Sequence, residues 1–203
     1  MKECIKIIFL DIDGVLNGYD FIEHIKYTVW KNIQNDKIKK FIKSKSHFTD
    51  IDKKRVKRLS KICKKTGAKI VLSSSVRNFL LNDNGEKIYD KHNGKLFWDL
   101  MDKYKIEVID KTPRKKNLRY REDEIIYWLS INQDKYDIKS FIILDDEDRH
   151  LSCFTYTNLV KTSYDGYYGA VRNKRKEYTG LTNKHVKIAI KKLRFPYNIL
   201  KKE

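Results

Sequence analysis

The sequence has little cysteine, proline or glycine, and it has no long hydrophobic run. Its 203 residues include 3 Cys, 2 Pro and 8 Gly, and 40% of them are hydrophobic, which excludes a collagen-like or low-complexity chain. The longest apolar run, residues 5–10, is interrupted by a lysine and is too short to cross a bilayer. It is followed by an aspartate rather than by a signal-peptide cleavage site. We therefore expect no membrane association.

The cysteines are odd in number and far apart, at Cys4, Cys63 and Cys153. This spacing argues against a disulfide framework and against a cysteine zinc site. It favours a reducing, intracellular compartment, by default the cytoplasm, with the nucleus left open. The length predicts one domain over residues 1–203, whose core needs no covalent or metal staple. Nothing in the sequence points to an obligate protein partner.

Positive charge is in excess and is concentrated in two stretches. The chain has 45 Lys and Arg against 27 Asp and Glu, which gives a net charge of +18. Residues 31–70 hold 15 basic and 3 acidic side chains, and residues 151–203 hold 12 and 3. Such blocks are typical of proteins that bind nucleic acid. An AT-rich codon bias would produce the same excess of lysine, so composition alone leaves both interpretations open.

Short apolar segments alternate along the chain with segments of helical periodicity. Continuous apolar strands separated by helices predict an α/β fold, in which helices cover both faces of a parallel sheet. The expected strands are residues 5–10, 69–72, 106–109, 141–144 and 157–161. The expected helices are the stretch between Asp52 and Gly67 and residues 96–104, 121–129 and 184–193.

Three of these strands end in carboxylate or hydroxyl side chains. The carboxyl ends of parallel strands meet at one edge of the sheet, where α/β proteins bind their ligands. We therefore expect these side chains to line one site. They are Asp11, Asp13, Ser73, Ser74, Asp145 and Asp146.

This set of side chains suits phosphoryl transfer. Asp11 and Asp13 are two residues apart, so they point to the same side of an extended chain, and crowded carboxylates favour a hard divalent cation such as Mg²⁺. With Mg²⁺ neutralising the site, one carboxylate can attack phosphorus and form an aspartyl-phosphate. The serines offer donors to phosphate oxygens, and a cationic side chain is still needed.

The strand ends resemble the motifs of the haloacid dehalogenase (HAD) superfamily of phosphohydrolases. The resemblance implies a HAD-like Rossmannoid fold, which is a three-layer sandwich with a central parallel sheet and at most a small lid insertion. The matching segments are Phe9–Leu16 (FLDIDGVL), Ile70–Ser75 (IVLSSS) and Ile142–Asp146 (IILDD).

Within the superfamily, the chain is most similar to the HAD domain of Swiss-army-knife RNA repair proteins. This similarity spans roughly residues 5–190 and adds three short matches to the superfamily motifs. The chain departs from the subfamily pattern at Val76, where tryptophan is usual. The added matches are Ser74–Arg77 (SSVR), Arg121–Ile125 (REDEI) and Gly180–Thr182 (GLT).

The resemblance assigns roles to the four aspartates. Asp11 would be the nucleophile and a Mg²⁺ ligand. Asp13 would protonate the leaving group, would then activate the hydrolytic water, and would bind Mg²⁺ through its main-chain carbonyl. Asp145 would complete the metal site, and Asp146 would position a water of the metal.

The resemblance also implies contacts to the substrate. Ser73 would hold the phosphoryl oxygens, although Ser74 is an alternative, and Arg77 would lie in the substrate site. The catalytic cation would be Arg121. The alternatives that the sequence leaves open for this cation are Arg119 and Lys115.

Two stretches rich in basic and aromatic residues complete the expectations. We expect residues 17–50 to form a small lid and residues 164–178 to form a loop, and both compositions suit single-stranded nucleic acid. The predicted function is a Mg²⁺-dependent phosphohydrolase that removes a terminal phosphate from a nucleic acid, at its 3′ end, or from a nucleotide. The alternatives are a small-molecule HAD phosphatase and a non-catalytic nucleic-acid-binding protein on a HAD fold.

Overall fold

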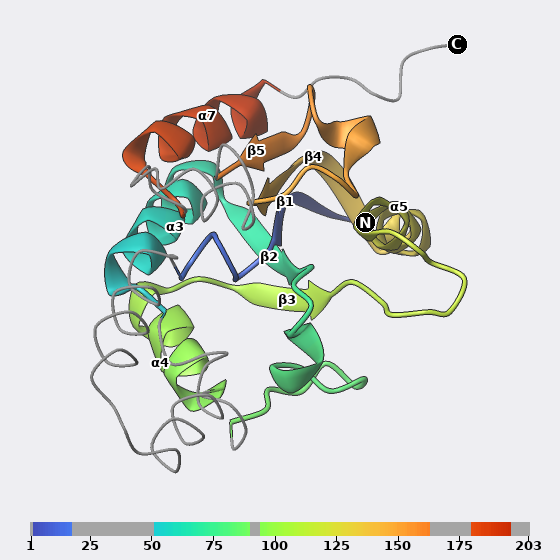
Figure 1. Ribbon diagram of the computed structural model, residues 1–203, viewed down its shortest axis with the longest axis horizontal. Helices are drawn as coiled ribbons and strands as arrows, with labels where there is room; N and C mark the ends of the chain where they lie inside the picture. The colour runs from blue at the N-terminus through green and yellow to red at the C-terminus, as the bar shows by residue number, and fades with distance from the viewer. Residues whose placement is uncertain (1, 18–50, 90–93, 163–179, 196–203) are drawn as a thin grey trace, which may run out of the picture.

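A parallel sheet lies at the centre of the protein. The computed structural model describes residues 2–17, 51–89, 94–162 and 180–195. Within these ranges a five-stranded sheet has the order β3-β2-β1-β4-β5 (Figure 1), which confirms the predicted α/β class. This arrangement is consistent with a HAD-like Rossmannoid fold. The strands are β1 (Glu3–Leu10), β2 (Ala68–Leu72), β3 (Val108–Lys111), β4 (Tyr136–Asp145) and β5 (Leu159–Lys161).

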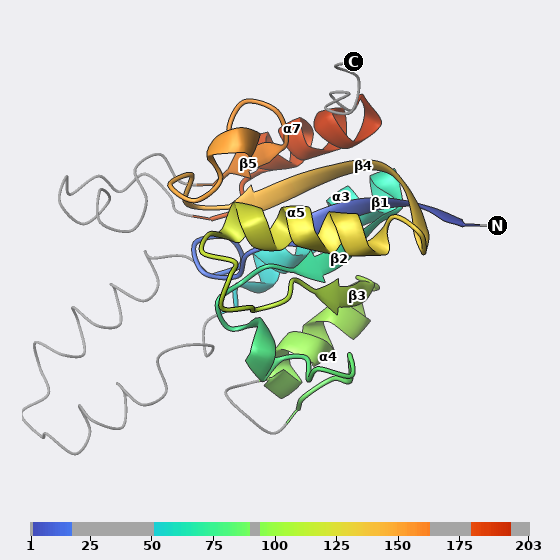
Figure 2. The same ribbon diagram turned by 90° about the vertical axis from the view of Figure 1, so that its right-hand side faces the viewer.

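Helices cover both faces of the sheet (Figure 2). One face carries α3 (Lys53–Thr66), α4 (Gly94–Tyr104) and α7 (Asn183–Arg194). The opposite face carries α5 (Arg121–Asn132) and the 3₁₀ helix η2 (Ser152–Phe154). A second 3₁₀ helix, η1 (Arg77–Phe79), follows β2.

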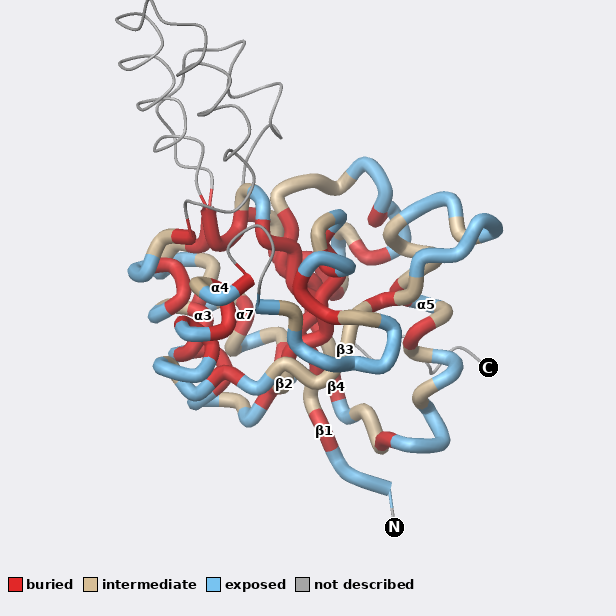
Figure 3. The backbone as a smooth tube through the Cα atoms, turned by 90° about the horizontal axis from the view of Figure 1, so that it is seen from below, coloured by how far each residue is buried: buried red, intermediate tan, exposed pale blue. Residues whose placement is uncertain are grey.

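The two helical layers pack on alternate side chains of the strands. Ile8 and Leu10 of β1 belong to the core beneath α3, α4 and α7, whereas Ile7 and Phe9 belong to the core beneath α5. This alternation with a period of two is the ordinary geometry of a strand. The buried residues follow the strands and the sheet-facing sides of the helices, and exposed residues lie on the outer sides (Figure 3).

The ends of α3 agree with the residues that predicted them. The side chain of Asp52 caps the helix by accepting a hydrogen bond from the backbone of Lys54. Gly67 ends it in the left-handed conformation, with φ of 70°. β3 begins two residues later than expected, because Ile106 is buried against α4 and the pairing with β2 begins at Val108.

Two sequence-based expectations lie largely outside the described residues. The expected lid over residues 17–50 has only Asn17 in the described part, and the expected loop over residues 164–178 has none. Among the helices that the structure describes, none has the length and hydrophobicity needed to span a membrane.

Candidate active site

The strand register brings three predicted site residues side by side. Phe9 of β1 pairs with Val71 of β2 and Ile143 of β4, and these three side chains all belong to the core beneath α5. Two residues further along the strands stand Asp11, Ser73 and Asp145. Because side chains alternate along a strand, these three continue the α5 side of the sheet. Backbone bonds of 2.9 Å from Asp11 N to Leu144 O and from Ser73 N to Leu10 O extend the pairing to this point.

Three carboxylates gather at this edge of the sheet. One oxygen each from Asp11, Asp145 and Asp146 lies within 4.8 Å of the others. Asp11 is 4% exposed and Asp145 is 1% exposed. Burial, with Asp11 nearby, raises the pKa of Asp145 to about 7, and burial with Asp11 and Asp145 nearby raises the pKa of Asp146 to about 8. Such a compact, buried, all-oxygen set fits a hard divalent cation, which would relieve the repulsion.

Arg121, the first residue of α5, lies between two of these carboxylates. Its Nη1 is 3.2 Å from Asp11 Oδ2 and forms an ion pair with Asp145. Burial lowers the pKa of Arg121, but Asp11 and Asp145 raise it more strongly, so the guanidinium stays charged. The surroundings of the two alternatives differ from those of Arg121. Lys115 lies over the ring of Tyr127, 4.1 Å from its centroid, and Arg119 is exposed.

Asp13 stands apart from the carboxylate cluster, on the exposed side of the turn after β1. Its Oδ1 accepts a hydrogen bond of 2.6 Å from Asn17 Nδ2. Asn17 Oδ1 in turn accepts one of 2.9 Å from Gly14 N, so buried Asn17 orients Asp13. Sequence reasoning did not single out Asn17, although its spacing of four residues from Asp13 within one turn was a usable signal.

Gly14 allows Asp146 to approach the turn. A Cβ at residue 14 would lie 2.4 Å from Cγ of Asp146, and the backbone there has φ of 69°. We expect Gly14→Ala to displace Asp146 and to weaken Mg²⁺ binding by about tenfold or more. Loss of a residue that holds a metal ligand in place typically costs about 10–100-fold in metal affinity. The measurement is the Mg²⁺ concentration needed for half-maximal thermal stabilisation.

A matched control for this variant is Gly85→Ala. Gly85 has a similar φ of 79°, but a Cβ there would meet nothing within 4 Å. It therefore imposes the same backbone strain, about 1–2 kcal/mol, without touching a carboxylate. Equal Mg²⁺ affinities for the two variants would contradict the role assigned to Gly14.

The two serines after β2 differ in their surroundings. The Ser73 hydroxyl is buried and has no hydrogen-bond partner among the described residues. The Ser74 hydroxyl lies 3.5 Å from Val76 N. The backbone carbonyl of Ser74 accepts a hydrogen bond from Arg77. A buried hydroxyl without a partner is costly, so Ser73 is the serine with unused capacity to hold a ligand.

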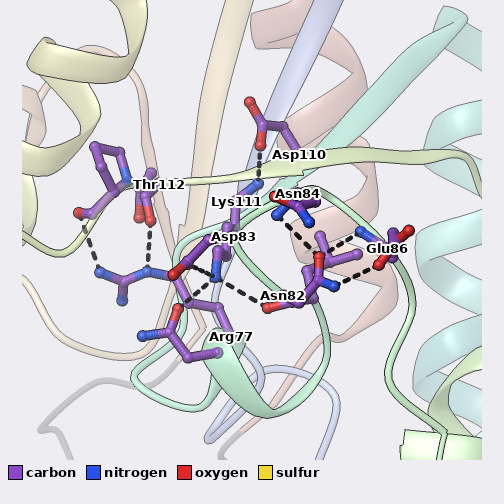
Figure 4. A network of polar contacts seen from close by, with 11 residues as sticks. Arg77, Asn82, Asp83, Asn84, Glu86, Asp110, Lys111 and Thr112 are labelled. Atoms are coloured by element: carbon purple, nitrogen blue, oxygen red, sulfur yellow. Dashed lines mark hydrogen bonds and ion pairs between the residues drawn. The ribbon is translucent and has the colours of Figure 1, made fainter.

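Arg77 lies inside the protein. It is 2% exposed, and its guanidinium donates to the carbonyls of Thr112 at 2.7 Å and Pro113 at 3.3 Å (Figure 4). It also donates to the carbonyl of Ser74 at 2.9 Å. It also forms an ion pair of 2.7 Å with Glu124. The substrate contact expected from the sequence stays a prediction, and in the structure these donors are directed to protein acceptors. Arg77 thereby joins the ends of β2 and β3 to the first turn of α5, which carries Arg121.

The loop that follows η1 is fastened to the end of β3. Lys111 Nζ lies 2.8 Å from Asn78 Oδ1, 2.9 Å from Leu81 O and 2.9 Å from Asp83 Oδ1 (Figure 4). Asn82 closes the adjoining turn by accepting bonds from the backbone of Asn84 and Glu86. These contacts hold the loop in place beside Arg77, at this edge of the sheet.

We expect Arg77→Met to lower the free energy of unfolding by about 3–5 kcal/mol, because it leaves Glu124 and three carbonyls without their partner. The control is Arg194→Met, which removes an exposed arginine with one 3.4 Å bond and should cost no more than about 0.5 kcal/mol. Urea unfolding measures both. A small loss at Arg77 together with a raised KM would instead indicate direct contact with substrate.

Comparison with known proteins agrees with this geometry. The model of one protein family, described as the HAD domain in Swiss Army Knife RNA repair proteins, matches residues 7–167. Neither a search of curated proteins nor a search of solved structures gave a match. The matched range contains the carboxylate cluster, Ser73 and Arg121. The chain therefore belongs to the family of HAD domains found in Swiss Army Knife RNA repair proteins.

Proposed function

We propose that the protein is a Mg²⁺-dependent phosphohydrolase that works through an aspartyl-phosphate on Asp11. Family membership supports a HAD-type phosphohydrolase in general. The observation that carries the finer proposal is the position of Asp11, whose carboxylate lies in the cluster with Asp145 and Asp146 and 3.2 Å from Arg121. A carboxylate held there has both a cation and metal-type ligands beside it.

The carboxylates of Asp11, Asp145 and Asp146 would hold Mg²⁺, and the main-chain carbonyl of Asp13 is a further proposed ligand. When bound, Mg²⁺ supplies positive charge that offsets the charge of the carboxylates and of the phosphate oxygens. The raised pKa values of Asp145 and Asp146 report how strongly the ion-free cluster resists three negative charges. A bound divalent cation would offset this repulsion, which supports the proposed metal site.

In the first step, one carboxylate oxygen of Asp11 attacks phosphorus. A bond forms between that oxygen and phosphorus, the bond from phosphorus to the ester oxygen breaks, and Asp13 gives its proton to the departing oxygen. In the second step, Asp13 takes a proton from a water molecule that attacks the same phosphorus. Inorganic phosphate leaves, and the carboxylate of Asp11 is restored.

Ser73 and Arg121 would hold the phosphoryl oxygens during both steps. The unpartnered hydroxyl of Ser73 can donate to one oxygen. Arg121 remains charged and can offer its guanidinium to others, at the place where charge develops. The 2.6 Å hydrogen bond from Asn17 would hold the carboxyl group of Asp13 in position for this proton transfer.

The proposed substrate is a terminal phosphate of a nucleic acid, at the 3′ end, or of a nucleotide. The family takes its description from RNA repair proteins, and the net charge of +18 favours a polyanionic substrate. A small-molecule phosphatase is the second candidate. A binding protein without catalysis is less well supported, because it would need neither Asp11 nor the Asn17 contact that orients Asp13.

A phosphatase assay over a panel of substrates tests the proposal. The panel contains 3′-phosphorylated and 5′-phosphorylated oligonucleotides, mononucleotides, sugar phosphates and an aryl phosphate, each with Mg²⁺ and with chelator. We expect Mg²⁺-dependent phosphate release that is fastest on an oligonucleotide end. Full activity in chelator would refute the metal site, and preference for a sugar phosphate would favour the small-molecule alternative.

A further inference from the structure

The helices α3 and α7 lie on one face of the protein, and all of their charged residues are basic. They pack side by side on the sheet although more than a hundred residues separate them in sequence (Figure 1). α3 contains 8 basic residues and α7 contains 5, and neither contains an Asp or Glu. Neighbouring surfaces from two distant parts of the chain therefore carry the same charge.

A uniform codon bias does not explain this distribution. α4 carries 2 basic and 2 acidic residues, and α5 carries 1 basic and 3 acidic residues. A bias toward lysine would act on all four helices, whereas the excess lies on the two that are adjacent in space. The position of the charge thus separates the two interpretations that composition left open.

The basic side chains form a stripe along each helix. In both helices the residues recur with the spacing i, i+3, i+7 and i+10, which keeps them on one side over about 15 Å. All of them are exposed, and none forms an ion pair with a carboxylate in the part of the chain that the structure describes. We call these eight residues the basic track: Lys54, Lys57, Lys61, Lys64, Lys184, Lys187, Lys191 and Arg194.

Part of this charge stands where it disfavours the helices themselves. The first turns of α3 and α7 contain Lys54 and Lys184 and no acidic residue, whereas the first turn of α5 contains three acidic residues. A lysine beside the positive end of the helix dipole costs about 0.3–1 kcal/mol. Because lysines at these positions destabilise the helices, their presence is better explained by binding of a negatively charged ligand than by a contribution to stability.

Both helices begin beside the candidate active site. Asp52 N, at the cap of α3, donates to Leu16 O at 2.9 Å, and Leu181 N, just before α7, donates to Val15 O at 2.9 Å. Val15 and Leu16 belong to the turn that holds Asp13. The two stripes therefore start at the turn of the active site and lead away from it.

We propose that the basic track binds the sugar–phosphate backbone of the nucleic acid whose terminal phosphate enters the active site. This inference rests on the proposed function, since it names the class of polymer that the site serves. Lysine carries a point charge and lacks the planar guanidinium with which arginine recognises base edges. The track should therefore bind the strand without selecting its sequence. Binding should release counterions and should weaken as salt rises, by a log–log slope of about −0.7 per contacted phosphate.

The test compares two variants that lose the same charge. The track variant carries Lys57→Gln, Lys61→Gln, Lys187→Gln and Lys191→Gln. The control variant carries Lys2→Gln, Lys105→Gln, Lys135→Gln and Lys139→Gln, which are exposed and lie at or near the opposite edge of the sheet. Fluorescence anisotropy with a labelled, 3′-phosphorylated single-stranded RNA gives Kd over a salt series. Chelator is present throughout, so that binding is measured without turnover.

We expect the track variant to bind the RNA at least about tenfold more weakly near 0.1 M salt, with a salt slope shallower by about 0.7 for each lost contact. The control variant should bind nearly as the parent does. Equal losses in both variants, or no loss in the track variant, would overturn the inference; the latter would point to another occupant such as an acidic protein.

The same proteins separate this inference from the proposed function. Turnover of a small aryl phosphate with Mg²⁺ reports on the active site alone, and we expect it to be unchanged in the track variant. RNA binding through the track without any phosphatase activity would refute the proposed function only. Phosphatase activity together with an RNA affinity that is the same in the track variant and in the parent would refute this inference only.

Discussion

Replacing Asp11 with asparagine is expected to lower kcat by about 10⁴-fold or more, because the amide cannot attack phosphorus and no other described group can take its place. The loss should appear on every substrate that the parent hydrolyses. The fold should persist, since Asp11→Asn also removes one of three crowded charges from the cluster with Asp145 and Asp146. Steady-state kinetics and a thermal unfolding curve measure the two effects.

Asp137→Asn is the matched control for this variant. It makes the same chemical change in β4, at the opposite edge of the sheet, where Asp137 forms an ion pair with exposed Lys139. Its kcat should equal that of the parent. Retention of normal turnover in Asp11→Asn, with the control behaving as expected, would remove the proposed nucleophile.

Asp13→Asn is expected to separate the two chemical steps. Loss of a general acid and base costs about 10²–10⁴-fold in rate. An aryl phosphate has a leaving oxygen that needs little protonation, so the first step should survive with that substrate while the second, which needs Asp13 to activate water, fails. Rapid-quench kinetics should therefore show a burst of the released phenol close to one equivalent per enzyme, followed by very slow turnover.

The companion variant is Asn17→Ala, which leaves Asp13 in place but removes the 2.6 Å bond that orients it. It should lower kcat less than Asp13→Asn does and should show the same bias toward substrates with good leaving groups. If Asp13→Asn slowed aryl and alkyl phosphates equally and gave no burst, Asp13 would not act on the leaving group and the water.

The central strand and its acidic end could be predicted because their signals are local. The run from Ile5 to Leu10 leads directly into Asp11, and the strand forms as that pattern indicates. The different orientations of Ser73 and Ser74 were also within reach of the sequence. Alternation places Ser73 on the side of Val71, and Val71 faces α5, where Arg121 lies.

The direction of Arg77 could not be predicted in the same way. Its spacing from Ser74 places it correctly beside the end of β2, but its contacts come from Thr112, Pro113 and Glu124, which follow in sequence by 35 residues or more. The position of Arg121 beside Asp11 and Asp145 likewise depends on where α5 begins relative to the sheet. β3 starts late for a similar reason, since its register is set by pairing with Ile70.

The most direct test of the account is to identify the phosphorylated residue. The protein is mixed with Mg²⁺ and an excess of phosphorylated substrate, quenched in acid during turnover, digested and analysed by mass spectrometry, with Asp13→Asn run in parallel to raise the yield of the intermediate. We expect one phosphoryl group on the peptide that contains Asp11, absent from Asp11→Asn and lost on treatment with hydroxylamine. Turnover without any phosphorylated peptide, or with the phosphoryl group on another residue, would contradict it.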